Sequence, residues 1–300
     1  MSQLQGNFDD FGMDTITLAG TLGAKLSAIS EAGFSQVMLS ARDLVGFDAG
    51  WRAAVQVVKD SGLRVTGFQV LRDFEGLSGH LHDYKVDIAK SMLEMCAALD
   101  CQVLLVCSST STHASNDLNA MARDLRKLAM LAVPLNIRIA FEGLSWGRTI
   151  NQFTAAWDVV CRADVPNLGL GFDSFHMFAA KTPLDELDLI DPRKIFLVQL
   201  ADFMWTEVRT FEERMATARH FRVFPGEGVH SDALAELVLR LDKIGYRGDY
   251  SFEVFNDDYQ QIPLEAVAAR GRRAAAWLGE EVLRRCVPLP NAMRLKGRGR

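Results

Sequence analysis

Short apolar runs alternate with longer amphipathic stretches along most of this chain. In the longer stretches, apolar residues recur three and four positions apart, as at Leu234, Leu237 and Leu241, which predicts helices with one buried face. The clearest of these helices are Thr21–Ala32, Trp51–Asp60, Tyr84–Leu99, Leu118–Ala132, Phe153–Arg162 and Asp232–Ile244. The short runs are rich in β-branched residues and have the length of buried strands. Eight such strands are expected, at Met13–Leu18, Gln36–Ser40, Arg64–Val70, Gln102–Cys107, Ile137–Glu142, Leu168–Asp173, Ile195–Leu200 and Asp249–Val254.

Eight strands alternating with helices in 300 residues predict an α/β fold, a (β/α)₈ TIM barrel. The alternative is a doubly wound open sheet, which normally carries a Gly-rich phosphate loop after its first strand; GxGxxG and GxxxxGK[ST] are both absent. We therefore expect one barrel domain over residues 1–285 and a basic, flexible tail over 286–300. The long charged segment Asp202–His220 is expected to form a loop or short helix that covers a site.

Polar residues end each of the last four predicted strands. They are Glu142, Asp173, Gln199 and Glu253. Any one of them, taken singly, could be a surface residue, a helix cap or a hydrogen-bonded core residue. The carboxyl ends of barrel strands converge on one face, however, so four in succession favour a common metal site. Three carboxylates and one amide oxygen are hard ligands that suit Mg²⁺ or Mn²⁺, and Co²⁺ shares the same set.

Further polar residues are expected near this site. His176 follows Asp173 by three residues, and a histidine beside a metal can act as base, acid or hydrogen-bond donor to substrate. Arg72 follows the third strand, and His220 and Arg222 precede the last unit; all three are expected to bind the substrate. An arginine fork suits a substrate carboxylate or phosphate. The alternative for each is a structural ion pair.

The composition of the chain argues against several classes of binding partner. Hydrophobic residues make up 49% and charged residues 24%, as in ordinary soluble globular proteins. The net charge of −5 argues against nucleic acid and acidic membrane surfaces, and no apolar run approaches the ~18 residues of a membrane span. Five scattered cysteines form no CxxC pair, and the N-terminus lacks the features of a signal peptide. We expect a cytoplasmic protein with reduced thiols.

Several segments resemble one family of enzymes. They are FEGLSWGRTINQFTAAWDVVCRADVPNLGLGFDSFHMF, KIFLVQLADF, RHFRVFPGEG and GYRGDYSFEVFND, together with FQVLRDFEGL nearer the start. In these segments the chain resembles bacterial 3-dehydroshikimate dehydratases, which belong to the sugar-phosphate isomerase/epimerase superfamily of xylose isomerase-like barrels. The resemblance extends from about Thr17 to about Leu278, and it is densest between Phe141 and Asp257.

The resemblance implies the same four metal ligands and a dehydration of 3-dehydroshikimate to protocatechuate through a metal-stabilised enediolate. It implies that His176, Glu142 and Glu253 are candidates for proton transfer, and that Arg72 and Arg222 bind the substrate. Because barrels of this family often pair, it also makes a homo-oligomer an expectation. The chain departs from the family at Ala41, Phe203 and Ala218, which leaves the metal ligands intact but puts the exact substrate in doubt.

Other functions share parts of this pattern. A sugar isomerase or epimerase, or an inosose dehydratase-like enzyme, would use the same ligands on a ketose or keto-polyol, with Glu142 and Glu253 exchanging protons. A barrel-type AP endonuclease would need a cluster of zinc-binding histidines and a basic surface, and this chain suggests neither. A non-catalytic ligand-binding barrel would be favoured by loss of metal ligands, and all four are present. The expected substrate is therefore a small keto acid or keto-polyol.

Overall fold

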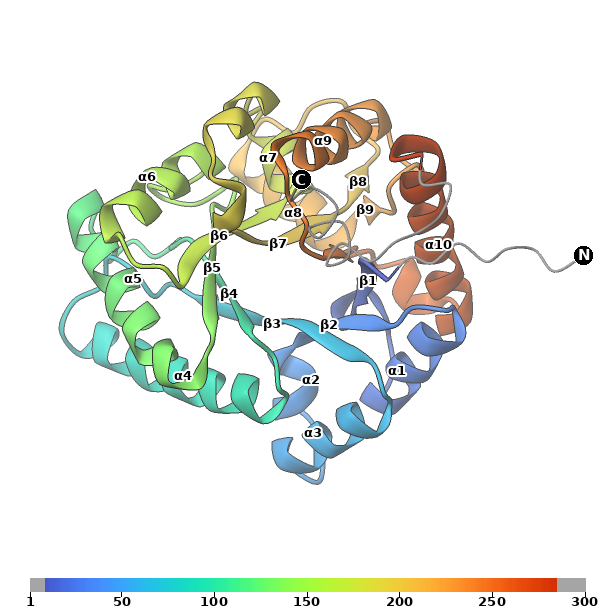
Figure 1. The fold of residues 1–300 in the computed structure, drawn as a ribbon, viewed down its shortest axis with the longest axis horizontal. Helices are drawn as coiled ribbons and strands as arrows, with labels where there is room; N and C mark the ends of the chain where they lie inside the picture. Colours follow the sequence, from blue (N-terminus) through green and yellow to red (C-terminus); the bar gives the residue numbers. More distant parts are fainter. Residues whose placement is uncertain (1–8, 285–300) are drawn as a thin grey trace, which may run out of the picture.

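A computed structural model describes residues 9–284 as a closed parallel β-barrel surrounded by helices (Figure 1). Each barrel strand is hydrogen-bonded to two others in the order β1-β10-β7-β6-β5-β4-β3-β2. This is the predicted TIM barrel. The barrel strands are β1 (Phe11–Asp14), β2 (Gln36–Ser40), β3 (Arg64–Arg72), β4 (Val103–Cys107), β5 (Arg138–Glu142), β6 (Leu168–Asp173), β7 (Ile195–Leu200) and β10 (Tyr250–Phe252).

Helices connect the strands and form the outer layer in Figure 1. Among residues 9–284, no helix combines the length and the apolar composition that crossing a membrane would require. The predicted tail at 286–300 lies outside the described residues. The α-helices are α1 (Leu22–Glu31), α2 (Ala41–Val45), α3 (Trp51–Asp60), α4 (Gly79–Ala98), α5 (Leu118–Ala132), α6 (Phe153–Ala163), α7 (Ser174–Ala179), α8 (Phe211–His220), α9 (Ser231–Ile244) and α10 (Leu264–Ala276).

The barrel strands are buried on both faces, as parallel strands covered by helices must be. Because successive side chains of a strand point to opposite faces, Leu105, Ala140 and Leu197 fill the barrel interior, while Phe141 and Val198 pack outward against the helices. The same alternation directs the side chains two positions further along these three strands into the barrel. Those side chains are Cys107, Glu142 and Gln199.

The register of neighbouring strands places the polar residues at their carboxyl ends at the same height along the barrel axis. Cys107 of β4 is the register partner of Glu142 of β5, and Asp173 of β6 is the partner of Gln199 of β7. Residues that are far apart in the sequence therefore meet at the carboxyl end of the barrel, where TIM-barrel sites lie.

Two predicted strands end earlier than expected. The run Met13–Leu18 was expected to be a strand, but β1 ends at Asp14 and Thr15–Thr17 form a 3₁₀ turn. The reason is local: the Asp14 carboxylate caps the turn by accepting from the amide of Ile16 at 2.9 Å, which outweighs the strand propensity of two threonines and an isoleucine. The last strand ends at Phe252 and not Val254, which places Glu253 just beyond it.

Other elements are longer than expected or were not foreseen. Strand β3 continues to Arg72, so this arginine ends the strand and does not follow it. Helix α4 begins at Gly79, five residues before the predicted start at Tyr84, and α10 was not predicted.

The segment after β7 contains a helix and one strand of a small two-stranded antiparallel sheet. Strand β8 (Asp202–Phe203) pairs antiparallel with β9 (Arg222–Val223), and α8 lies between them in the chain. Helix α8 begins with a capping box, in which the Thr210 side chain and the Glu213 side chain each bond to the other's backbone amide. The segment Asp202–His220, expected to be a loop or short helix, thus contains β8 and, in its second half, the ten-residue helix α8.

Candidate active site

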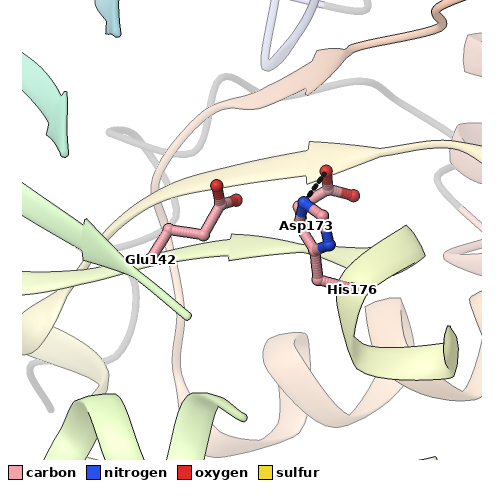
Figure 2. A group of neighbouring side chains, drawn as sticks. All are labelled: Glu142, Asp173 and His176. Carbon is pink, nitrogen blue, oxygen red and sulfur yellow. Dashed lines mark ion pairs between the residues drawn. The ribbon is translucent and has the colours of Figure 1, made fainter. Parts of the chain in front are cut away.

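The four predicted metal ligands lie at the carboxyl ends of neighbouring strands. Glu142 and Asp173 are the last residues of β5 and β6, Gln199 is the fifth residue of β7, and Glu253 follows β10. All four side chains are buried. Figure 2 shows Glu142 and Asp173 pointing toward the same space, with His176 beside Asp173. The ligand atoms of Glu142, Asp173 and His176 lie within 4.8 Å of one another, close enough to hold one ion.

Two oxygen atoms of this group have no partner. Glu142 Oε1 and Gln199 Oε1 are buried and accept no hydrogen bond from any of residues 9–284. Their companion atoms are engaged: Cys107 Sγ donates to Glu142 Oε2 at 3.0 Å, and Gln199 Nε2 donates to Gln69 Oε1 at 3.5 Å. Buried acceptors are normally satisfied because an unmade hydrogen bond is costly. Two free oxygens beside further carboxylates therefore fit a cation.

Arg222 is the internal counter-charge of the site. Its side chain is 2% exposed, and Nη1 donates to Asp173 Oδ2 at 2.7 Å and to Glu253 Oε2 at 3.0 Å. Its Nε donates to the carbonyl of Ala218 in the last turn of α8 at 2.9 Å. One buried guanidinium thus bridges two of the predicted metal ligands and ties α8 to them. Arg222, predicted to bind substrate, also has this structural role.

Two of the buried carboxyl groups, those of Glu142 and Glu253, resist ionisation. Burial, reinforced by the charges of Asp173 and Glu253, raises the pKa of Glu142 to about 8. Burial also raises the pKa of Glu253, against the opposing effect of Arg222. Such shifts are expected where like charges converge in a water-poor pocket, and a bound divalent cation would reverse them.

The His176 ring is held in one orientation. Its Nδ1 accepts from the amide of Ser145 at 3.2 Å, and its Nε2 lies 3.6 Å from Asp173 Oδ2 (Figure 2). Burial and the nearby Arg222 charge lower the pKa of His176 well below its ordinary value, so the ring is neutral at pH 7. Because Nδ1 accepts a hydrogen bond, the single ring proton belongs on Nε2, directed toward Asp173.

A cavity of about 410 Å³ opens above these residues. Its polar lining includes Gln69, Arg72, Arg219 and Arg222, and its apolar lining includes Leu144, Trp146 and Phe255. Trp146 packs edge-on against His176 with the ring centres 4.8 Å apart, which adds to the fixed position of the imidazole. The cavity is therefore lined by both charged and apolar side chains.

The predicted substrate-binding residues do not all reach this cavity. Arg72 and Arg222 line it, but His220 is not among the lining residues; its Nδ1 lies 3.0 Å from Asp257 Oδ2 and its side chain is 46% exposed. Of the three departures from the family, Ala218 lines the cavity. Phe203 is instead buried against Phe175, and Ala41 begins α2.

Three polar residues of the cavity lining were not foreseen from the sequence. They are Gln69, Cys107 and Arg219. Cys107 ends an apolar strand in the same way as Glu142, so the rule that found the carboxylates would also have found it. Arg219 lies in the same RHFR segment as Arg222, and nothing in the sequence showed that its helix turns it toward the cavity.

Comparison with known proteins agrees with this geometry. The model of the xylose isomerase-like TIM barrel family matches residues 26–280, and the chain belongs to this family. A curated 3-dehydroshikimate dehydratase of Pseudomonas aeruginosa is 37% identical over 267 residues, which cover 89% of this chain and 41% of that protein. An inosose isomerase of Bacillus licheniformis is 28% identical over 212 residues, covering 69% of this chain and 72% of that protein.

Solved structures share the fold. A fusion of a xylose isomerase-like TIM barrel with 4-hydroxyphenylpyruvate dioxygenase superimposes with a TM-score of 0.85 and 35% identity, covering 92% of this chain and 43% of that one. The IOLI protein, crystallised with a zinc atom, superimposes with a TM-score of 0.78 at 20% identity, covering 91% of this chain and 99% of that one. This chain spans about two-fifths of the length of the two Pseudomonas dehydratases and of the fusion protein that it matches.

Proposed function

We propose that this barrel dehydrates 3-dehydroshikimate to protocatechuate with the help of a divalent cation. The observation that carries the proposal is the pair of free buried oxygens, Glu142 Oε1 and Gln199 Oε1, inside a site of three carboxylates. Similarity to curated 3-dehydroshikimate dehydratases supports the choice of reaction. The proposal concerns the reaction of this barrel, whatever the remaining part of the longer relatives contributes.

Glu142, Asp173, Gln199 and Glu253 would hold the cation, for which Mg²⁺, Mn²⁺ and Co²⁺ are suitable. When bound, the cation supplies a Lewis acid that polarises the ketone of the substrate. His176 lies as close to Glu142 and Asp173 as a ligand would, but we assign it to proton transfer because its Nε2 carries the proton.

The reaction removes the proton on the carbon next to the ketone and the hydroxyl on the following carbon, and water leaves. Glu142 and Glu253 are the candidates to accept the carbon-bound proton, because they are buried carboxylates that face the cavity. His176 lines the cavity, and its Nε2 lies 3.6 Å from Asp173 Oδ2, beyond hydrogen-bond distance, so its proton is available to a substrate oxygen or to the departing hydroxyl. The apolar lining residues Leu144, Trp146 and Phe255 would exclude water from parts of the cavity and suit the flat aromatic product.

We place this reaction in the cytosol and on a small molecule. Cys96, Cys101 and Cys107 are buried free thiols, which are typical of a reducing compartment. A cavity of about 410 Å³ is of the size that small ligands occupy.

The experiment is to incubate the protein with 3-dehydroshikimate and Mg²⁺ or Mn²⁺ and follow the absorbance of the catechol product. We expect turnover that is lost with EDTA and restored by excess cation. The Gln199→Met variant should lose cation affinity and activity, whereas Gln56→Met, on the exposed face of α3, should keep both. Full turnover in EDTA would exclude the cation's role.

The second candidate is an isomerase of a keto-polyol. Similarity to inosose isomerases supports it, at lower identity. Turnover of an inosose or a ketose with no turnover of 3-dehydroshikimate would establish this reaction in place of the dehydration.

A further inference from the structure

We propose that Arg219, on the last turn of α8, is a specificity-determining residue that binds the carboxylate of the substrate together with Arg72. The inference rests on the proposed function, because it concerns which substrates of this reaction type the cavity accepts. Arg219 and Arg72 come from opposite parts of the chain and line the same cavity.

The first argument is that both guanidinium groups are free. Within residues 9–284, neither Arg72 nor Arg219 forms an ion pair or a side-chain hydrogen bond, whereas Arg222 uses Nη1 on Asp173 and Glu253. Both free arginines are exposed at the surface of the protein as well as lining the cavity, so they lie toward its mouth. Arg222 lies below them, buried among the predicted metal ligands.

The second argument is charge balance. When ionised, Glu142, Asp173 and Glu253 carry three negative charges, which Arg222 and one divalent cation would neutralise. Asp14 is not among the residues that line the cavity, and its carboxylate accepts hydrogen bonds from Gln69 and from the amide of Ile16. The two free arginines therefore leave the loaded cavity with surplus positive charge.

A surplus of this kind selects for an anion. A neutral ketose would leave both guanidinium groups without a counter-charge, whereas a ring with a carboxylate would pair with them through planar, charge-assisted hydrogen bonds. The arrangement places the anionic end of the substrate at the mouth and the reacting ketone at the predicted metal ligands.

The third argument is that the backbone of Arg219 is fixed while its side chain is not. The carbonyl of Ala218 accepts from Arg222 Nε at 2.9 Å, and the carbonyl of His220 accepts from the amide of Asp257 at 3.1 Å. Earlier in α8, Arg214 Nη1 donates to the carbonyl of Ser145, the residue that orients His176. The helix thus presents Arg219 to the cavity from a position fixed by contacts with Arg222, Asp257 and Ser145.

The test compares two probes that differ by one carboxylate. Protocatechuate and catechol share the same pair of hydroxyls, so the ratio of their dissociation constants isolates the contribution of the carboxylate. We would measure both by calorimetry on the Mg²⁺-loaded protein. For the unaltered protein we expect protocatechuate to bind at least about tenfold more tightly than catechol, a ratio equivalent to about 1.4 kcal/mol.

Three variants define the expected pattern. Arg219→Met should lower the ratio by about tenfold, and Arg219→Lys should lower it less because the charge is retained. Arg193→Met is the matched control, since Arg193 is 88% exposed and lies before β7, at the opposite end of the barrel. It should leave the ratio unchanged. In turnover, Arg219→Met should raise KM about tenfold while kcat changes less than about threefold, since the residue contributes to binding and not to the chemical step.

The inference is overturned if the unaltered protein does not prefer protocatechuate, or if Arg219→Met keeps the preference. It is separable from the proposed function. If 3-dehydroshikimate is turned over and the ratio is insensitive to Arg219, the inference fails and the reaction stands. If the ratio depends on Arg219 and 3-dehydroshikimate is not turned over, carboxylate recognition stands and the reaction must be reassigned.

Discussion

Removal of Arg222 tests how the site balances its charge. This guanidinium is 2% exposed and bridges two buried carboxylates at 2.7 Å and 3.0 Å. Replacing one partner of a buried ion pair leaves an uncompensated charge and typically costs about 3–5 kcal/mol. For a domain somewhat larger than 250 residues, one kcal/mol corresponds to about 2 °C in Tm. We therefore expect Arg222→Met, at pH 8 and in EDTA, to lower Tm by about 6–10 °C.

A divalent cation should offset much of this loss. Because the cation neutralises the same carboxylates, it can replace the charge that Arg222 supplied. In the unaltered protein, a cation at 100 times its dissociation constant stabilises the fold by about 2.7 kcal/mol. We expect the rise in Tm on adding Mn²⁺ to be larger in Arg222→Met than in the unaltered protein.

Thermal melts by circular dichroism, with and without Mn²⁺, provide the measurement. Arg52→Met is the control, because Arg52 forms an exposed ion pair with Glu94 that should contribute no more than about 1 kcal/mol. If the Tm of Arg222→Met in EDTA were within about 2 °C of that of the unaltered protein, the expected loss of about 3–5 kcal/mol would be refuted. A rise with Mn²⁺ no larger than that of the unaltered protein would refute the idea that arginine and cation share the same carboxylates.

Two further predictions concern single residues near the site. Burial raises the pKa of Glu75 to about 8 from an ordinary 4.5, so its contribution to stability is fully present below about pH 4.5 and is lost as pH rises toward 8. Glu75→Gln mimics the protonated form, so the free energy of unfolding by urea should fall less between pH 4.5 and pH 8 in this variant than in the unaltered protein. If the free energies of the two proteins fell in parallel with pH, the prediction would be contradicted. Cys107→Val removes the 3.0 Å hydrogen bond to Glu142 and should weaken Mn²⁺ binding about fivefold by calorimetry, with recovery in Cys107→Ser. Equal Mn²⁺ affinity in the valine variant would show that the thiol does not orient the carboxylate.

Much of the fold and part of the site could be read from local pattern. Strands β2, β6 and β7 fall at the predicted residues, because a continuous apolar run with β-branched side chains has few other conformations once it is buried. The polar ends Glu142 and Asp173 follow from the same runs, since strand direction in a barrel decides which end meets the others. The failure at Met13–Leu18 has an equally local cause, the Asp14 cap, which strand propensity does not reveal.

The sequence by itself determined the number and order of the β/α units, the hard character of the four predicted ligands and the resemblance to a family of dehydratases. These are properties of residue type and period along the chain. Only the tertiary structure decided that Arg222 lies buried between Asp173 and Glu253, that His220 stays out of the cavity and that Arg219 enters it. These three residues lie within one stretch of four, so spacing cannot separate them. Their roles depend on how α8 and β9 dock against strands distant in sequence, which is a property of packing.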